Sequence, residues 1–171
     1  MKNRGVIMAV IIAIALMAVF FLPNKKSYRT LAVVGKPVQD FTLNDSAGKS
    51  WKLSDLKGKV VFINFWATWC VTCKAEQADK VKLDKLMQGK PFQMLGVLFR
   101  DDPKNLPGYI KKIKVSAPTL VDPKNDLSQL YGITGVPETF ILDKEGILRE
   151  RLVGPQAWGD TDMVALIEKW L

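Results

Sequence analysis

The most constraining feature of the chain is a seven-residue run, Val60–Trp66, that leads into the motif Trp69-Cys-Val-Thr-Cys73. The run is almost wholly apolar and rich in β-branched and aromatic residues, which is typical of a central strand covered on both faces. Apolar residues at helical spacing follow the motif, so the two cysteines are expected between a strand and a helix. A separation of three residues brings both sulfur atoms to the first turn of that helix. The sequence therefore predicts an α/β domain with a redox-active cysteine pair at this junction.

The position of Cys70 in the motif predicts its chemistry. It is expected at or before the first helical residue, where unpaired N–H groups and the helix dipole favour a thiolate. Cys70 is therefore the predicted nucleophile and Cys73 the resolving cysteine, with a mixed disulfide as the intermediate. A C-x-x-C motif alone is also compatible with two buried cysteines that have no joint chemistry. The position of the motif between a strand and a helix disfavours this alternative.

The residues that the chain lacks exclude several other chemistries. There is no histidine, which excludes Ser-His-Asp and Cys-His nucleophiles and the C-x-x-C-H site of haem attachment. Only two cysteines are present, so one chain cannot build a Cys₄ or Cys₂His₂ zinc site. We expect neither a metal nor a cofactor.

Apolar periodicity extends the α/β pattern to the C-terminus. Further strands are predicted over residues 40–44, 50–53, 92–99, 119–121, 139–142 and 147–153, with helices over 71–87, 106–113 and 127–131. Ser54 is expected to cap a short helical turn, and Asp160 or Thr161 a last helix. The helix after the cysteines is expected to bury Val71, Ala75, Ala78, Val81 and Met87 and to expose Lys80, Lys82 and Lys85. The order of elements predicts a mixed sheet with helices on both faces.

The N-terminal segment differs in composition from the rest. The net charge is +8, but the first 29 residues hold five basic residues and no acidic one, against 20 basic and 17 acidic residues in the remainder, so a nucleic-acid surface is not indicated. Gly5–Leu22 carries no charge over 18 residues, long enough to cross a bilayer. No small-residue cleavage site follows it, which favours a transmembrane signal anchor over residues 1–22 rather than a cleaved signal peptide. Residues 23–34 are then a tether, and residues 35–171 a domain expected outside the cytoplasmic membrane, on the periplasmic or outer side.

Several motifs in this order resemble a known family. The segments Phe65-Trp-Ala-Thr-Trp-Cys-Val-Thr-Cys-Lys-Ala-Glu76, Gly132-Ile-Thr-Gly-Val-Pro-Glu-Thr-Phe-Ile-Leu-Asp143 and Gly35-Lys-Pro-Val are similar to those of the membrane-anchored thioredoxin-like proteins of cytochrome c maturation, of the DsbE/CcmG type and close to the ResA and TlpA types. The resemblance covers about residues 35 to 171. It implies a thioredoxin-like α/β fold with an N-terminal β-hairpin extension, preceded by one transmembrane helix.

The resemblance also implies roles for individual residues. Pro137 falls at the position of a cis-proline beside the cysteines, which would leave the backbone of Val136 free to pair with an extended substrate. Glu76 matches a buried acid that exchanges a proton with Cys73, with a helix-dipole role as the alternative. Glu138 either receives a partner or caps its strand, and Trp69 is expected on the exposed rim around the site.

The function implied is that of a tethered thiol:disulfide oxidoreductase that reduces disulfides in apocytochrome c or in a protein that handles it. Electrons would come from a transmembrane thiol carrier of the DsbD/CcdA type. A general exported disulfide oxidant or isomerase is the first alternative, since the motif does not fix the reduction potential. A peroxidase is disfavoured because the cysteines form a close pair, and a thioredoxin-fold copper chaperone because the chain has no histidine.

Overall fold

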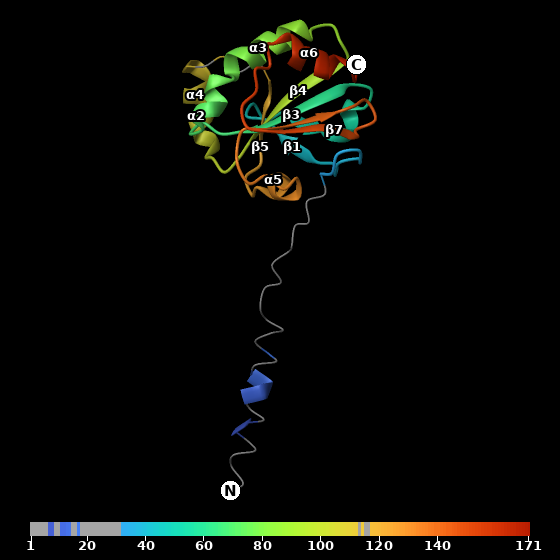
Figure 1. Cartoon of the computed structure of the whole chain (residues 1–171). Coiled ribbons are helices and arrows are strands. Elements are labelled where there is room, and N and C mark those ends of the chain that lie inside the picture. Colours follow the sequence, from blue (N-terminus) through green and yellow to red (C-terminus); the bar gives the residue numbers. More distant parts are fainter. Residues whose placement is uncertain (1–6, 9–10, 15–16, 18–31, 113, 115–116) are drawn as a thin grey trace.

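The fold is built on one five-stranded sheet. The computed structural model describes residues 7–8, 11–14, 17, 32–112, 114 and 117–171 (Figure 1). The strand order is β5-β4-β3-β6-β7, in which β3 pairs in parallel with β4 and antiparallel with β6. The strands are β3 (Val60–Trp66), β4 (Phe92–Leu98), β5 (Thr119–Val121), β6 (Glu138–Leu142) and β7 (Leu148–Val153). The predicted mixed sheet is confirmed, and every residue of its central strand β3 is buried.

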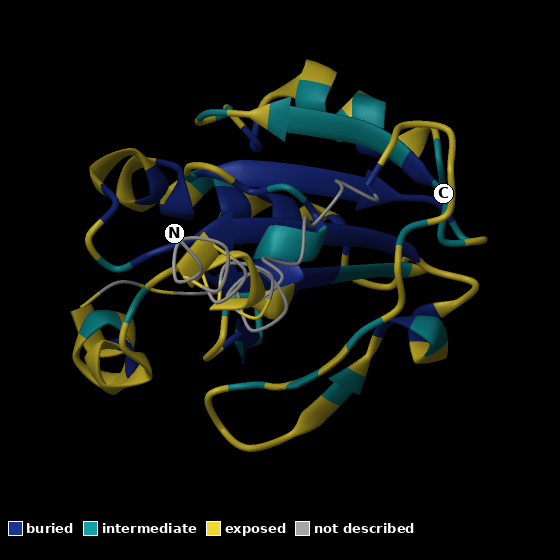
Figure 2. Ribbon diagram, turned by 90° about the horizontal axis from the view of Figure 1, so that it is seen from below, coloured by how far each residue is buried: buried dark blue, intermediate teal, exposed yellow. Residues whose placement is uncertain are grey.

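Helices cover both faces of the sheet, as predicted. Figure 1 shows α3 (Gln77–Leu86) and α6 (Thr161–Glu168) above one face, with α2 (Val71–Ala75) and α4 (Leu106–Lys112) beside them. The other face carries α5 (Asp126–Leu130), the 3₁₀ turn η1 (Leu53–Leu56) and the expected N-terminal hairpin of β1 (Thr42–Asn44) and β2 (Ser50–Lys52). A second 3₁₀ turn, η2 (Pro103–Asn105), precedes α4. Figure 2 shows the buried strands enclosed by elements whose outer sides are exposed.

Alternation along β3 divides the core into two layers. Phe62 packs with Leu83 of α3 and Ile167 of α6, whereas Phe65 packs with Tyr131 and Phe140 on the hairpin and α5 side. Because successive side chains of a strand point to opposite faces, Asn64 and Trp66 lie on the same face as Phe62. This places a polar side chain under the helix that follows the cysteines.

The helix after the cysteines differs from the prediction in two ways. It is not continuous from 71 to 87 but divides at Glu76 into α2 and α3. Its buried face is also not the predicted apolar stripe, since Val71 is 81% exposed and Ala75 and Ala78 are exposed, whereas Glu76, Gln77 and Lys80 are buried. The spacing of apolar residues indicated the wrong face of the helix, because the interior offers polar partners to the buried polar side chains. Of the predicted apolar stripe, only Met87 is buried.

Of the two predicted helix caps, one is wrong and the other is right in position. The 3₁₀ turn begins at Leu53 with Lys52 as its N-cap, and no side chain caps it, so Ser54 lies inside the turn. Asp160 occupies the N-cap position of α6 as expected, but its side chain makes no capping hydrogen bond.

Most of the expected anchor and of the tether lies outside the described residues, as does Ile113, the last residue of the helix predicted over 106–113. Among the residues that are described, no helix is both long and apolar enough to cross a bilayer.

Candidate active site

Cys70 lies between the end of β3 and the start of α2, Cys73 lies within α2, and the two form a disulfide. Cys70 is the N-cap of α2, and its Sγ accepts a hydrogen bond of 3.1 Å from the backbone N–H of Cys73. Its sulfur therefore lies at the helix N-terminus, where a thiolate is stabilised once the disulfide is reduced. Cys73 is fully buried and Cys70 is 5% exposed, so Cys70 is the more accessible of the two residues.

A second segment, distant in the sequence, lies against Cys70. The carbonyl oxygen of Val136 is 3.7 Å from Cys70 Sγ, and the Val136–Pro137 peptide bond is cis, as the resemblance implied. The hydroxyl of Thr72 is 3.5 Å from the same sulfur. Backbone and side-chain polar groups therefore meet at the nucleophile from both α2 and the segment before β6.

The rim beside Cys70 is apolar and open to solvent. Trp69 is 57% exposed, as expected, and its indole N–H donates to the carbonyl oxygen of Arg100 at 3.3 Å. Val71 follows the nucleophile and is the more exposed of the two. By contrast Trp66 is 1% exposed and belongs to the core.

Glu76, three residues after Cys73, is buried in a cluster of hydrogen-bond donors. Its Oε1 accepts from Lys80 Nζ at 3.0 Å and from Asn64 Nδ2 at 3.4 Å. Its Oε2 accepts at 3.3 Å from both the Gln156 backbone N–H and Trp158 Nε1. The expectation that Lys80 lies on a solvated face is wrong: it is 4% exposed, because its ammonium reaches Glu76 and Asn64 in the interior, whereas Lys82 and Lys85 are exposed as predicted.

Glu138 is buried at the first position of β6. Arg151 of β7 donates from Nε to its carboxylate at 2.6 Å and from Nη2 to the carbonyl oxygen of Gly132 at 3.1 Å. The guanidinium thus connects Glu138 to the loop before Pro137 and neutralises the carboxylate. The ion pair explains how an acid fits beside the site.

The loop that precedes Cys70 is held by Asp101. The Asp101 carboxylate accepts from the backbone N–H of Thr68 at 2.6 Å and from its hydroxyl at 2.7 Å, and from Asn105 Nδ2 at 2.9 Å. Burial would raise the pKa of Asp101, but hydrogen bonds from Thr68, Asn105 and the Asp102 backbone outweigh it and hold the pKa below its ordinary value.

Replacing Asp101 by asparagine is expected to lower the free energy of unfolding by about 1 kcal/mol at neutral pH, because a charge-assisted acceptor is lost. A carboxylate whose pKa is lower in the folded state stabilises the fold above its unfolded pKa and loses this effect as the pH falls through the folded pKa. The difference between the variant and wild type should therefore shrink below about pH 4. Urea unfolding at several pH values measures it.

Asp102→Asn is the matched control for this experiment. Asp102 is exposed and caps η2 by accepting from the backbone N–H of Lys104, a role that asparagine fills equally well. Equal destabilisation by the two substitutions would contradict the assignment of the stabilising contact to Asp101.

Sequence reasoning missed most residues of the polar cluster and the partner of Glu138. The missed residues are Lys80, Gln156, Trp158, Thr139 and Arg151. Lysine and arginine in an amphipathic pattern ordinarily indicate solvent, and only the fold brings these residues to the carboxylates. In the described part of the chain no group of histidine, cysteine or acidic residues is arranged to hold a metal ion.

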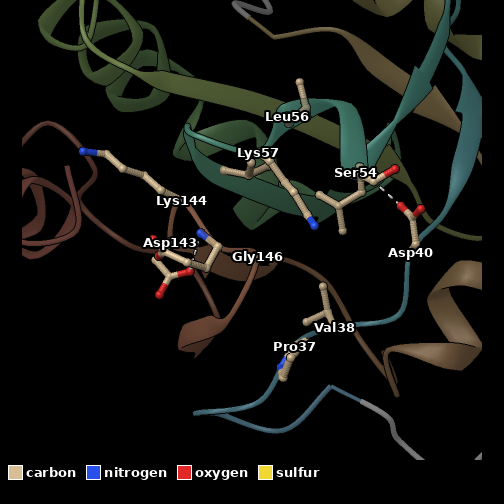
Figure 3. Close-up of a pocket in the computed structure, with 12 residues that line it drawn as sticks. Pro37, Val38, Asp40, Ser54, Leu56, Lys57, Asp143, Lys144 and Gly146 are labelled. Atoms are coloured by element: carbon tan, nitrogen blue, oxygen red, sulfur yellow. Dashed lines mark hydrogen bonds between the residues drawn. The ribbon is translucent and has the colours of Figure 1, made fainter.

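A separate pocket lies at the other end of the sheet. It has a volume of about 390 Å³ and is lined by Val38, Leu56 and Val61, with Asp40 at its edge accepting from the backbone N–H of Ser54 (Figure 3). Val61 is at the start of β3 and Cys70 follows its end, so a strand length of roughly 20 Å separates the two regions. The pocket contains none of the predicted site residues.

A mixed sheet with helices on both faces and a cysteine pair at a helix N-terminus defines a thiol:disulfide oxidoreductase of the thioredoxin-like class. The chain belongs to the AhpC/TSA family, whose model matches residues 34–151. This match, together with the relatives described next, confirms the predicted thioredoxin-like fold and the assignment of the chain as an enzyme.

Individual relatives agree with this assignment. The chain is 28% identical over 156 residues to the thiol-disulfide oxidoreductase ResA of Geobacillus thermodenitrificans, with 90% of each chain covered. It is 28% identical over 159 residues to a protein of Pasteurella multocida described as a probable thiol:disulfide interchange protein DsbE-2, covering 90% of this chain and 82% of that protein. The exposed lipoprotein thioredoxin Etrx1 of Streptococcus pneumoniae superimposes with a TM-score of 0.67 at 30% identity, covering 78% of this chain and 100% of that one.

Proposed function

We propose that the chain is a membrane-tethered reductant of disulfides in apocytochrome c, or in a protein that handles it, during cytochrome c maturation. The observation that carries the proposal is a cysteine pair at a helix N-terminus in a chain that is similar to ResA over 90% of both lengths. Haem attachment needs the free thiols of a C-x-x-C-H segment, and an oxidising compartment tends to close them. A dedicated reductant beside the membrane keeps these thiols available.

The proposed exchange proceeds in two steps. In the reduced enzyme the Cys70 thiolate attacks a substrate disulfide, forms a mixed disulfide and releases one substrate thiolate. The Cys73 thiol then gives its proton to the Glu76 carboxylate and attacks Cys70 Sγ, which releases the second substrate thiolate and closes the enzyme disulfide. The proton then passes from Glu76 to solvent or to the leaving thiolate. The enzyme is oxidised and the substrate is reduced by two electrons.

The substrate is proposed to lie along the segment before β6. An extended peptide would pair with the backbone of Val136 next to Pro137, in the manner of strand addition, and its apolar side chains would contact Trp69. Glu138 would not contact the substrate. Its ion pair with Arg151 would hold the backbone of this segment in the conformation that the substrate meets.

The N-terminal segment supplies the proposed location. A signal anchor over residues 1–22 and a tether over 23–34 would keep the domain on the outer side of the cytoplasmic membrane. Because small thiols outside that membrane are not a reducing pool, a transmembrane thiol carrier of the DsbD/CcdA type would re-reduce the cysteine pair.

The reduction potential of the Cys70–Cys73 pair tests this direction of electron flow. Equilibration of the full chain with defined dithiol buffers is expected to give a value well below about −200 mV, as a reductant requires. A value near about −120 mV, that of a strong oxidant, would contradict the proposal and favour the exported oxidant. The reduced enzyme should also open the disulfide of an apocytochrome peptide that contains C-x-x-C-H.

A further inference from the structure

Lys80 places a buried positive charge against the acid that follows the cysteine pair. Its Nζ lies 3.0 Å from Glu76 Oε1, and the two side chains are 5% and 2% exposed. The same ammonium donates to Asn64 Oδ1 at 2.8 Å. Lys80 lies one helical turn after Glu76, which itself lies one turn after Cys73. An ion pair withdrawn from water therefore begins one turn along the chain from the resolving cysteine.

Every described contact to the Glu76 carboxylate comes from a hydrogen-bond donor. Besides Lys80, these donors are Asn64 of β3 and the segment before α6, which supplies the backbone N–H of Gln156 and the indole of Trp158. All of them except Lys80 are neutral, and Asn64 is in turn bonded to the neutral hydroxyl of Thr139 on β6.

Lys80 is the only cation that the described residues place against the Glu76 carboxylate. The charged group one turn beyond Lys80 on α3 is an acid, Asp84. Among the described residues Asp84 forms no ion pair with Lys80, and burial raises the pKa of Asp84. If Lys80 lost its charge, the Glu76 carboxylate would keep only neutral donors. Its negative charge would then cost more in this interior.

Fold stability does not account for this ion pair. Withdrawing two charges from water costs about as much as their attraction returns, so apolar residues of similar size in place of both would stabilise the fold at least as well. Methionine matches Lys80 in length, and the cavity beside Lys80 and Asn64 holds only about 10 Å³, which leaves no room for a larger side chain. Burial lowers the pKa of Lys80, and the neighbouring Glu76 carboxylate opposes this effect.

We propose that Lys80 is a positioning residue for disulfide exchange: its ammonium holds Glu76 as an oriented carboxylate, ready to take the proton of Cys73. This inference rests on the proposed role of Glu76 as proton acceptor in the second step. Lys80 touches neither sulfur and acts through Glu76 alone. The structure thus assigns to a lysine on α3 control of the pH at which the mixed disulfide is resolved.

The test is Lys80→Met in the full chain, reduced and mixed with dithiobis(nitrobenzoate) in stopped flow. Attack by Cys70 releases one coloured thiolate in a first phase, and attack by Cys73 on the mixed disulfide releases a second. Without the ammonium the carboxylate that receives the proton of Cys73 keeps only neutral donors, so the acid limb of the second phase should move to higher pH by about one unit or more. The pH profile of the first phase should stay as in wild type.

Three variants make the test specific. Lys82→Met removes an exposed lysine of the same helix and should leave both phases unchanged. Glu76→Gln should slow the second phase and remove its acid limb, and adding Lys80→Met to it should cause no further shift. Urea unfolding shows whether each variant is folded, and Lys80→Gln replaces Lys80→Met if the latter is not.

The outcomes separate the inference from the proposed function. A folded Lys80 variant with the wild-type second-phase profile overturns the role of Lys80, while the exchange reaction and the role of Glu76 stand. An equal shift in the Lys82 variant also overturns it. A Glu76→Gln profile like that of wild type would remove both Glu76 and Lys80 from the mechanism, although two-phase exchange by the cysteines would remain.

Discussion

Replacing Cys70 by serine is expected to abolish disulfide exchange, whereas replacing Cys73 by serine should trap the substrate on Cys70. Serine at position 70 lacks a thiolate, so no mixed disulfide forms and the rate should fall by more than about a thousandfold, as when other covalent nucleophiles are removed. Serine at position 73 leaves the first attack intact and blocks its resolution. Mass spectrometry after mixing each variant with a disulfide peptide measures the trapped adduct.

The two variants control for each other. Both lose the Cys70–Cys73 disulfide, so any general effect of its loss on the fold is common to them. An adduct on the Cys70→Ser variant and none on Cys73→Ser would reverse the two roles. That result would also conflict with the greater accessibility of Cys70 and its position at the N-terminus of α2.

The sheet could be predicted from the sequence because its central strands are buried on both faces. Such strands are nearly continuous apolar runs, and both β3 and β4 were found from this signal alone. The turn between β6 and β7 could be predicted from its residues, Asp143-Lys-Glu-Gly146. In the structure Gly146 has a positive φ of 83°, a conformation that suits glycine. Local signals were sufficient where burial is apolar and turns are tight.

The helix after the cysteines could not be predicted in the same way, because its interior face is polar. Glu76 and Lys80 are stable there only because β3 supplies Asn64 and the segment before α6 supplies two further donors. Those partners lie between 12 and 82 residues from Glu76 along the chain. A periodicity argument sees only neighbours within a few turns, so it chose the exposed Val71 and missed Lys80.

Two further side-chain contacts around the site are also long-range. The carboxylate of Asp101 reaches Thr68 across 33 residues, and Trp69 reaches the backbone of Arg100 across 31. The strand–motif–helix pattern supplied the cysteines, and the family resemblance supplied Glu76 and Pro137, because these belong to motifs with fixed spacing. It supplied neither Lys80 nor Asp101, because what these residues do follows from the contacts of this particular fold.

Trp158 connects the hydrophobic core to the polar cluster, and its replacement is expected to have the largest effect on stability. The side chain is fully buried and packs edge-on against Phe62, with 4.7 Å between ring centroids. Trp158→Ala should lower the free energy of unfolding by about 3–5 kcal/mol, as expected for loss of a buried aromatic ring. Circular dichroism during urea unfolding measures this without relying on tryptophan fluorescence.

Trp158→Phe separates the two contributions of this side chain. Phenylalanine keeps much of the packing on Phe62 but removes the N–H that donates to Glu76 Oε2, so a smaller loss of about 1–2 kcal/mol is expected. Trp69→Ala, at the exposed rim, should change stability by less than about 0.5 kcal/mol. If Trp158→Phe were as destabilising as Trp158→Ala, the main contribution of the indole would be its hydrogen bond. The polar cluster around Glu76, rather than the apolar layer beneath α6, would then determine how firmly this part of the fold is held.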